Sequence, residues 1–402
     1  MTVTPLQQRF LNHVAQTSPF SLGLEVGKAK GVHIYDVNGR PYLDFISGIG
    51  VTNLGHCHPA VVEAVCRQAQ SYAHTMVYGE HIQEPQVELA EKIADIAPDG
   101  LNCVYFLSTG SEANDAALKM AAKLTGRSRY VAFTKAYHGD TVGAAACFGN
   151  ESYRKPFALL LPQVDFLRFN DLEALESINQ NHAAVIVEPV QGEGGIRLPA
   201  PGFLQAIRDH CTQTGTMLIF DEVQTGFGRL GGWFAAGVFN VTPDIIVMGK
   251  AMGAGLPLAG LLASRESLNR FAADPPFSHI TTFGGNPISC AAGLAGIRSI
   301  EYDRLLTHAS AMGEGLLKSA QEIMAAYPEK VTHVRGLGLM IGVELKTEAM
   351  ARQVVEKARD YGVLFETTLL DEKTVRLSPP LIITPQHCHQ GIDALARAIE
   401  RL

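Results

Sequence analysis

The chain carries PDIIVMGK at residues 243–250, and the glycine-rich loop AMGAG follows directly at residues 251–255. The apolar, β-branched run predicts a buried strand, Ile245–Met248, that delivers Lys250 to a turn. Burying an ammonium group there is unfavourable unless the charge is paired or neutralised. A neutral Lys250 would be a nucleophile able to form a Schiff base with an aldehyde. Taken alone, the motif also fits a strand-terminal lysine that reaches into solvent.

Short apolar runs alternate with segments of helical spacing on either side of this stretch. The further predicted strands are Cys103–Leu107, Arg129–Phe133, Ala183–Val187 and Met217–Phe220. Predicted helices include residues 59–73, 84–96, Glu112–Leu124 and Gly202–Thr214. Alternation of this kind predicts an α/β fold with a mostly parallel sheet covered on both faces.

The pattern changes after about residue 290. Predicted helices Ala291–Ser299, Leu305–Ala326 and Thr347–Tyr361 accompany predicted strands Val331–Arg335, Leu339–Glu344 and Thr374–Leu377. Near the N-terminus, Gly31–Phe45 alternates around Asn38-Gly39 and predicts a β-hairpin with a type I′ turn. We therefore expect a large domain at 51–290 and a smaller α+β domain at 291–402, which the N-terminal segment and hairpin, 1–50, help to complete.

Composition excludes several classes of protein. The 402 residues are 47% hydrophobic and 18% charged, and the net charge of −7 includes no basic run, so we expect no nucleic-acid partner. No apolar run reaches the length of a membrane span, and the N-terminus shows no secretion signal. Seven dispersed cysteines fit reduced thiols and a cytoplasmic location. The triplets at 56–58 and 387–389, HCH in both cases, lack a second ligand pair, so no metal site is expected.

Polar residues follow several of the predicted strands. The segment STGSEAN, residues 108–114, opens a helix and could bind a phosphate at its N-terminus or could be an ordinary helix cap. Asp221 ends an apolar strand and could pair with a protonated pyridine nitrogen or form a structural salt bridge. Since ligands of open α/β sheets lie outside the carboxyl ends of the strands, Asp221 and Lys250 are expected at one site.

Three further segments add to this set. They are AYHG at 136–139, EPVQGEGG at 188–195 and TTFGGNP at 281–287. Tyr137 could stack on a heteroaromatic ring or be a core tyrosine at a strand end. Each segment is a weak signal alone, and only their coincidence favours a cofactor site.

Together these motifs resemble the class-III pyridoxal-phosphate (PLP) aminotransferases, of the acetylornithine, ornithine and 4-aminobutyrate type. The resemblance runs from Gly31–Phe45 and LGHCHP at 54–59 to RLSPP at 376–380, and the interval from Asp221 to Lys250 is similar. It implies fold type I of the PLP-dependent transferases. The implied activity passes an amino group from an ω-amino acid or diamine-type donor to 2-oxoglutarate by a ping-pong mechanism, in a homodimer with its sites at the interface.

The resemblance implies a role for each matching residue. Lys250 holds PLP through a Schiff base and then moves the substrate proton, while Asp221 pairs with the pyridine nitrogen. The other implied cofactor contacts are Val223 and Tyr137 on the two ring faces, Gln224 on the ring hydroxyl, Thr109, Gly110 and Ser111 around the phosphate, and Thr282 on the phosphate of the other subunit's cofactor. Arg376 is the implied carboxylate-binding residue, and Glu193 pairs with it when the bound substrate has no α-carboxylate there.

One position departs from the acetylornithine, ornithine and 4-aminobutyrate transaminases, which usually carry an arginine where this chain has Asp140. An anion in place of a cation reverses the preference of that corner of the substrate site and favours a diamine or basic amino acid. Diaminopelargonate-type transaminases share the HGDT sequence found at 138–141, although chain length favours the acetylornithine/ornithine branch.

Two other hypotheses compete with this one. A glutamate-1-semialdehyde-type aminomutase needs no separate acceptor, but Arg376 favours a transaminase because it offers a binding group for glutamate. A cofactor-free scaffold is disfavoured because every expected cofactor contact is present.

Overall fold

The computed structural model describes residues 3–18, 23–77 and 79–402. A seven-stranded sheet forms its centre, in the order β4-β10-β9-β8-β7-β5-β6. Its strands are β4 (Cys103–Leu107), β5 (Arg129–Phe133), β6 (Val164–Leu167), β7 (His182–Val187), β8 (Met217–Asp221), β9 (Ile245–Met248) and β10 (Ala259–Ala263). The pairs β6/β5, β5/β7, β7/β8 and β8/β9 are parallel, and β10 runs antiparallel to β9 and β4. The predicted mostly parallel sheet is confirmed, while β6 and β10 were not predicted.

Both faces of the central sheet are buried, because alternate residues of its strands enter different hydrophobic clusters. In β7, Val185 and Val187 pack in the cluster that contains α8 (Phe203–Thr214), whereas Ala184 and Ile186 pack in the one that contains α5 (Gly110–Thr125). This two-residue alternation is the geometry of a strand covered on both faces, and it explains why the run is apolar throughout.

The C-terminal part forms a second, antiparallel sheet in the order β11-β12-β15-β14. These strands are β11 (Val331–Leu337), β12 (Met340–Leu345), β14 (Glu366–Thr367) and β15 (Thr374–Leu377). They are accompanied by α12 (Leu305–Ala326), α13 (Glu348–Asp360) and α14 (Pro385–Glu400). Three of these strands and two of these helices match predicted elements, so the α+β character of this part is confirmed.

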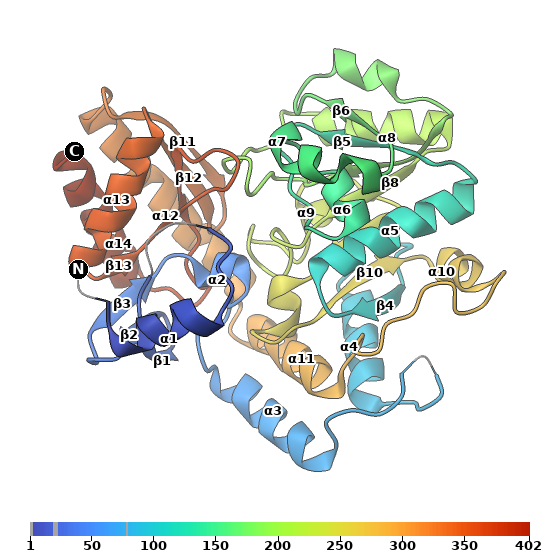
Figure 1. Ribbon diagram of the computed structural model, residues 1–402, viewed down its shortest axis with the longest axis horizontal. Coiled ribbons are helices and arrows are strands. Elements are labelled where there is room, and N and C mark those ends of the chain that lie inside the picture. The colour runs from blue at the N-terminus through green and yellow to red at the C-terminus, as the bar shows by residue number, and fades with distance from the viewer. Residues whose placement is uncertain (1–2, 19–22, 78) are drawn as a thin grey trace.

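The N-terminal strands join the C-terminal part (Figure 1). They are β1 (Val26–Lys30), β2 (His33–Asp36) and β3 (Pro41–Asp44), and β3 pairs in parallel with β13 (Val363–Leu364). Figure 1 shows these blue strands beside the orange and red helices at one side of the molecule, with the central sheet at the other. The exact division of the chain at residues 50 and 290 stays a prediction.

The hairpin is confirmed, but its predicted type I′ turn is wrong. A type I′ turn needs positive φ at both central residues, and here Gly39 (φ +84°) has it while Asn38 does not. The Asp36 carboxylate accepts hydrogen bonds from the Asn38 and Arg40 N–H groups at 2.9 Å each, and the Gly39 N–H donates to the Asp36 carbonyl at 3.0 Å. The Asp36 side chain therefore stabilises a wider turn that the Asn-Gly pair does not reveal.

In the sequence, the remaining α-helices lie before or between the strands and helices given above. They are α1 (Pro5–His13), α2 (Ser47–Gly50), α3 (Pro59–Ser71), α4 (Glu84–Asp95), α6 (Val142–Ala146), α7 (Glu151–Arg154), α9 (Ala235–Val238), α10 (Arg265–Ala272) and α11 (Pro287–Tyr302). In the described ranges, short 3₁₀ helices occupy Lys155–Leu160, Glu173–Ser177 and Lys250–Gly253. In the described part of the chain, no helix is both long enough and apolar enough to cross a membrane.

Candidate active site

A cavity of about 500 Å³ lies at the carboxyl ends of the central strands. Asp221 ends β8 and pairs in register with Val247 of β9, and Lys250 follows three residues further along. Nine predicted site residues line the cavity: Thr109, Gly110, Ser111, Tyr137, Asp140, Asp221, Val223, Gln224 and Lys250. Asn114, His138, Gly139, Thr141 and Glu188 line it too, although the sequence assigned them no role. The parallel sheet thus brings together residues separated by more than a hundred positions.

Lys250 meets the cavity in a strained backbone conformation. Its φ is +47°, in the left-handed region, which costs a residue with a side chain about 1–3 kcal/mol. Burial lowers the pKa of Lys250 to about 8, although the nearby Glu193 carboxylate acts in the opposite direction. Within the described ranges its ammonium has neither an ion-pair nor a hydrogen-bond partner. A half-buried, unpaired amine of lowered pKa is a competent nucleophile and proton carrier.

The Asp221 carboxylate is held by three groups and is only 4% exposed. One oxygen, Oδ2, accepts from Asn114 Nδ2 at 2.8 Å and contacts His138 Nδ1 at 2.7 Å, and Oδ1 accepts from the Val223 N–H at 3.1 Å. Across the described residues, no lysine or arginine forms an ion pair with it. A buried carboxylate fixed in this way and facing a cavity is suited to a cationic ligand atom.

The first turn of α5 borders the same cavity, next to Val223 and Gly249. Thr109 is the N-cap: its hydroxyl accepts from the Glu112 N–H, and the Glu112 carboxylate accepts from the Thr109 N–H. Both the cap and the proposed anion site therefore use this turn. Over the described ranges, no acceptor meets the N–H groups of Gly110 and Ser111, which leaves them available to a phosphate at the positive end of the helix.

Close packing around this turn depends on two glycines. A side chain on Gly110 would approach Val223 Cγ atoms to 3.0 Å, and one on Gly139 (φ +111°) would approach Ser111 Oγ to 2.4 Å. Ser111 Oγ in turn accepts from the Thr141 N–H at 2.9 Å. The glycines let three cavity walls meet at the α5 N-terminus.

Tyr137 and Asp140 interact directly with each other. The Tyr137 hydroxyl donates to Asp140 Oδ2 at 2.7 Å, and the Tyr137 ring packs edge-on against Phe148 with 5.3 Å between centroids. Burial, followed by this hydrogen bond, raises the pKa of Tyr137 above its ordinary value. Asp140 therefore orients the ring of Tyr137 as well as placing an anion at the edge of the cavity.

Glu188 is a buried acid in the wall of the cavity. Its Oε1 accepts from the Tyr137 N–H and its Oε2 from the Gly192 N–H, both at 2.9 Å. Burial raises the pKa of Glu188 to about 7. The signal for it in the sequence is an acid directly after the apolar run Ala183–Val187 of β7, and its side chain holds the Tyr137 backbone.

Glu193 and Arg376 form a buried ion pair beside the cavity. Arg376 Nη2 donates to Glu193 Oε2 at 2.7 Å, and Gln224 Nε2 donates to Glu193 Oε1 at 2.9 Å. Burial alone would raise the pKa of Glu193, but the charges of Arg376 and Lys250 and the hydrogen bonds outweigh it and lower that pKa to about 2. The predicted pairing of Glu193 with Arg376 is thus present in the geometry, and Gln224 links it to the cavity.

Thr282 lies elsewhere. Its side chain is exposed and does not line the cavity of its own chain, so its predicted contact with a second subunit's cofactor stays a prediction. Within the described residues, no group of three or more His, Cys, Asp or Glu side chains could hold a metal ion.

A lysine just after one strand, a buried carboxylate at the end of the neighbouring strand and an open helix N-terminus thus line one cavity. The Aminotransferase class-III family model matches residues 14–399, and the chain belongs to this family. It is an aminotransferase, and its substrates are an amino donor and a 2-oxo acid.

Individual relatives sharpen the comparison. The chain is 41% identical to the acetylornithine aminotransferase of Methanosarcina mazei over 93% of this chain and 91% of that protein. It is 38% identical to the one of Archaeoglobus fulgidus over 96% and 98%. Among solved structures, the ornithine aminotransferase of Toxoplasma gondii superposes with a TM-score of 0.92 at 28% identity, covering 98% of this chain and 94% of that one. The predicted family and its fold type I architecture are confirmed.

Class-III aminotransferases depend on PLP, and the cavity fits that cofactor. Asp221 offers a buried carboxylate without a lysine or arginine partner among the described residues, which suits a protonated ring nitrogen. The Gly110 and Ser111 N–H groups suit its phosphate, and the glycine at 139 keeps the approach to Ser111 free of a side chain. Lys250 lines the same cavity and offers an amine that suits its aldehyde group.

Proposed function

We propose that this enzyme transfers the ω-amino group of a basic amino acid or its acylated derivative to 2-oxoglutarate by a ping-pong mechanism. The observation that carries the proposal is the Glu193–Arg376 ion pair next to Lys250 and Asp221. One site can then bind two substrates in turn. The first is an ω-amine that places no carboxylate on Arg376, and the second is a dicarboxylate that displaces Glu193 from Arg376. The proposed location is the cytoplasm.

Lys250 and Asp221 have different roles toward the cofactor. When bound, PLP supplies a cationic ring that accepts the electron pair released as the substrate C–H bond breaks. Lys250 would hold the cofactor covalently at Nζ, and its amine, once released, would carry the proton between two substrate positions. Asp221, positioned by Asn114 and His138, would pair with the ring nitrogen and keep it protonated.

The Glu193–Arg376 ion pair acts as a switch between the two kinds of substrate. With Glu193 on Arg376, the arginine charge is neutralised and an ω-amine chain meets no strong carboxylate site. When glutamate binds, its carboxylate replaces Glu193 on Arg376 and the Glu193 side chain turns away. An arginine that is 1% exposed binds a carboxylate tightly because few waters compete for it.

The donor is proposed from Asp140 and from the relatives. Similar proteins are named acetylornithine aminotransferase and ornithine aminotransferase. Asp140 places an anion in the wall of the cavity. Because Asp140 also accepts from the Tyr137 hydroxyl, only part of its charge faces a donor. We expect a diamine or a basic amino acid such as ornithine to be favoured over an N-acylated ornithine. A diaminopelargonate-type transaminase is the second candidate, which the HGDT sequence at 138–141 supports.

A homodimer is also proposed, in which Thr282 of one subunit contacts the cofactor phosphate of the other. The exposed position of the Thr282 side chain is compatible with such a contact. Replacing it should weaken PLP binding without changing the spectrum of the bound cofactor. Light scattering that gave the mass of a monomer for the fully loaded enzyme would contradict the dimer.

Single half-reactions test the substrate proposal. Holoenzyme mixed with ornithine, acetylornithine, lysine, 4-aminobutyrate or a diaminopelargonate-type amine should lose its PLP absorbance band with the true donor, and 2-oxoglutarate should restore it. A donor that is converted with no consumption of 2-oxoglutarate would favour the aminomutase instead.

A further inference from the structure

The loop at residues 368–373, between β14 and β15, holds Glu193 by its backbone. The Leu369 N–H donates to Glu193 Oε2 at 2.9 Å, and the Leu370 N–H donates to the Glu193 carbonyl at 2.9 Å. Glu193 Oε2 is the same oxygen that accepts from Arg376. The position of this loop therefore decides how well Glu193 is stabilised on the arginine.

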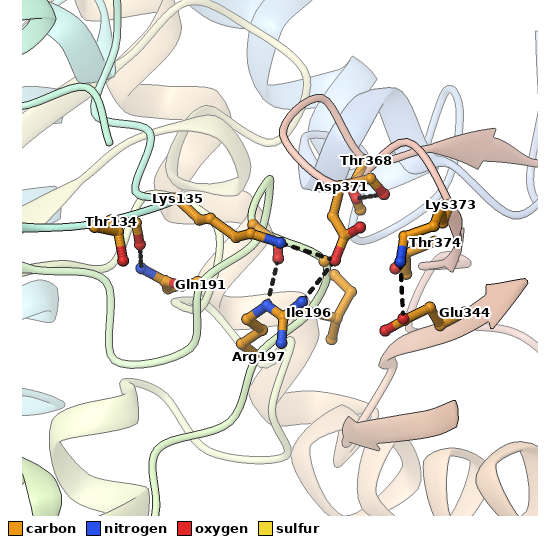
Figure 2. Close-up of polar contacts among 12 residues, drawn as sticks. Thr134, Lys135, Gln191, Ile196, Arg197, Glu344, Thr368, Asp371, Lys373 and Thr374 are labelled. Atoms are coloured by element: carbon orange, nitrogen blue, oxygen red, sulfur yellow. Dashed lines mark hydrogen bonds and ion pairs between the residues drawn. The ribbon is translucent and has the colours of Figure 1, made fainter. Parts of the chain in front are cut away.

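Asp371 fixes the loop to the rest of the molecule (Figure 2). Its side chain is 4% exposed, and Oδ2 contacts Arg197 Nη2 at 2.7 Å, Lys135 Nζ at 3.4 Å and Arg335 Nη2 at 3.9 Å. Figure 2 shows Lys135 and Arg197 reaching the Asp371 carboxylate from the central part of the protein, while the loop belongs to the C-terminal part. One carboxylate thus gathers three cations from three segments.

Arg197 and Glu193 belong to the same short segment. The ion pair between Asp371 and Arg197, called the tie below, therefore connects the loop to the segment that carries Glu193. Arg197 Nε donates to the Gly194 carbonyl at 2.8 Å, and Arg335 Nε donates to the Gly195 carbonyl at 2.7 Å. A side chain on Gly195 (φ +102°) would come within 2.7 Å of Asp371 Oδ2. The segment that carries Glu193 and the loop that binds it are therefore in close contact, with Asp371 between them.

The loop itself is compact, so a displacement of Asp371 moves its neighbours. Thr368 Oγ1 and the Thr374 N–H both donate to the Asp371 carbonyl at 2.8 Å. Asp371 is two residues from Leu369. A loosened Asp371 would shift the Leu369 N–H away from Glu193, while the Arg376 guanidinium, placed by the neighbouring strand β15, would stay.

We propose that Asp371 is a positioning residue for the Glu193–Arg376 switch and sets the balance between ω-amine donors and dicarboxylates. This inference rests on the proposed function, in which a dicarboxylate must displace Glu193 from Arg376. Displacement breaks the Leu369 hydrogen bond as well as the ion pair. By holding Leu369 in place, Asp371 favours the state with Arg376 neutralised, which suits the ω-amine, and disfavours the state that binds glutamate.

Removing the tie should therefore move the two half-reactions in opposite directions. In holoenzyme, Asp371→Asn should tighten the Kd of glutarate, a dicarboxylate without an amino group, about three- to tenfold by calorimetry. For each half-reaction, the ratio of its rate constant to the Kd of its substrate should rise for glutamate and fall for the ω-amine donor. Arg197→Gln removes the other end of the tie and should shift both values in the same directions. A double variant should add little to either single change.

Glu344→Gln is the matched control. Glu344 Oε2 accepts from Arg335 Nη1 at 2.7 Å, and Oε1 pairs with Lys373 Nζ of the loop at 3.5 Å. This variant therefore removes a different carboxylate from the same charged cluster but leaves Asp371 bound to Arg197. It should leave the ratio of the two half-reactions unchanged. Thermal unfolding of each variant separates a shift of this ratio from a general loss of folded protein.

Two results would overturn the role of Asp371. One is an equal fall of both half-reactions, and the other is an unchanged glutarate Kd in the folded Asp371 and Arg197 variants. If Asp371→Asn does not fold, the result for Arg197→Gln decides. Failure of the proposed function has a different signature: wild-type enzyme that binds no glutarate and transfers no amino group to 2-oxoglutarate.

Discussion

The lysine site and the arginine site lie next to each other but are built in different ways. Lys250 and Asp221 are placed by neighbouring parallel strands, whose register is fixed by buried side chains on both faces. Glu193 is held by a loop, by its own short glycine-rich segment and by the ion pairs of Asp371, whereas its partner Arg376 lies in β15. The first arrangement is rigid and suits a reaction that needs fixed atoms. The second can rearrange and suits a site that must accept two kinds of substrate.

The largest expected effect falls on the rigid site. Lys250→Ala should reduce both half-reactions by about 10³-fold or more, since the proton carrier and the covalent attachment are lost together. Stopped-flow absorbance of the PLP band measures this. Lys318→Ala, an exposed change on α12, is the control and should have no effect. Full activity in Lys250→Ala would remove the lysine from the mechanism.

Asp221→Asn tests the neighbouring strand and should slow both half-reactions about 10²–10³-fold, because a neutral amide no longer stabilises a protonated ring nitrogen. Asp244→Asn is a matched control: Asp244 directly precedes β9, at the opposite ends of the same strands, where it pairs with Arg208. An equal loss in both variants would point to folding of the sheet and away from the ring nitrogen.

The pH dependence of cofactor capture follows from the lowered pKa of Lys250. Only the neutral amine attacks an aldehyde, and the amine is protonated below its pKa of about 8. The rate at which apoenzyme captures PLP should therefore rise roughly fifty-fold from pH 6 to pH 8 and level off above. A rate that kept rising to pH 10 would show that burial does not lower the pKa of this lysine.

The smallest effect is expected at the adaptable site. Glu193→Gln removes the negative charge but keeps a side chain of the same shape, which leaves Arg376 open to a carboxylate. Glutarate should bind about tenfold more tightly, a change of about 1.4 kcal/mol, and the ω-amine half-reaction should weaken. Gln224→Ala, which loses one hydrogen bond to Glu193, should show a smaller change in the same direction. Weaker glutarate binding in Glu193→Gln would exclude the switch.

The difference between the two sites also explains what the sequence could predict. The strands around Lys250 and Asp221 are short apolar runs ended by polar residues, a pattern that local periodicity detects. β10 was missed because Ala259–Ala263 consists of alanine, glycine and leucine and lacks the β-branched residues typical of strands.

Residues that act through a distant partner were also missed. His138 and Asn114 stand within the quoted motifs, but their contact with Asp221 depends on how three strands assemble. Asp371 carries no local signal at all, since its cations lie 36 to 236 positions away in the chain. A family resemblance names the residues that touch the cofactor, whereas the residues that hold them in place depend on this chain's own contacts.

The pairing of β3 with β13 has a consequence for biosynthesis. Leu43 pairs with Val363, so the N-terminal strands cannot complete their sheet until nearly the whole chain has left the ribosome. At about 5–20 residues per second, the open edge of β3 waits on the order of half a minute. An unpaired strand edge is a site of aggregation during that interval. We therefore expect folding in the cell to depend on the rate of translation and on chaperones that bind the nascent N-terminus.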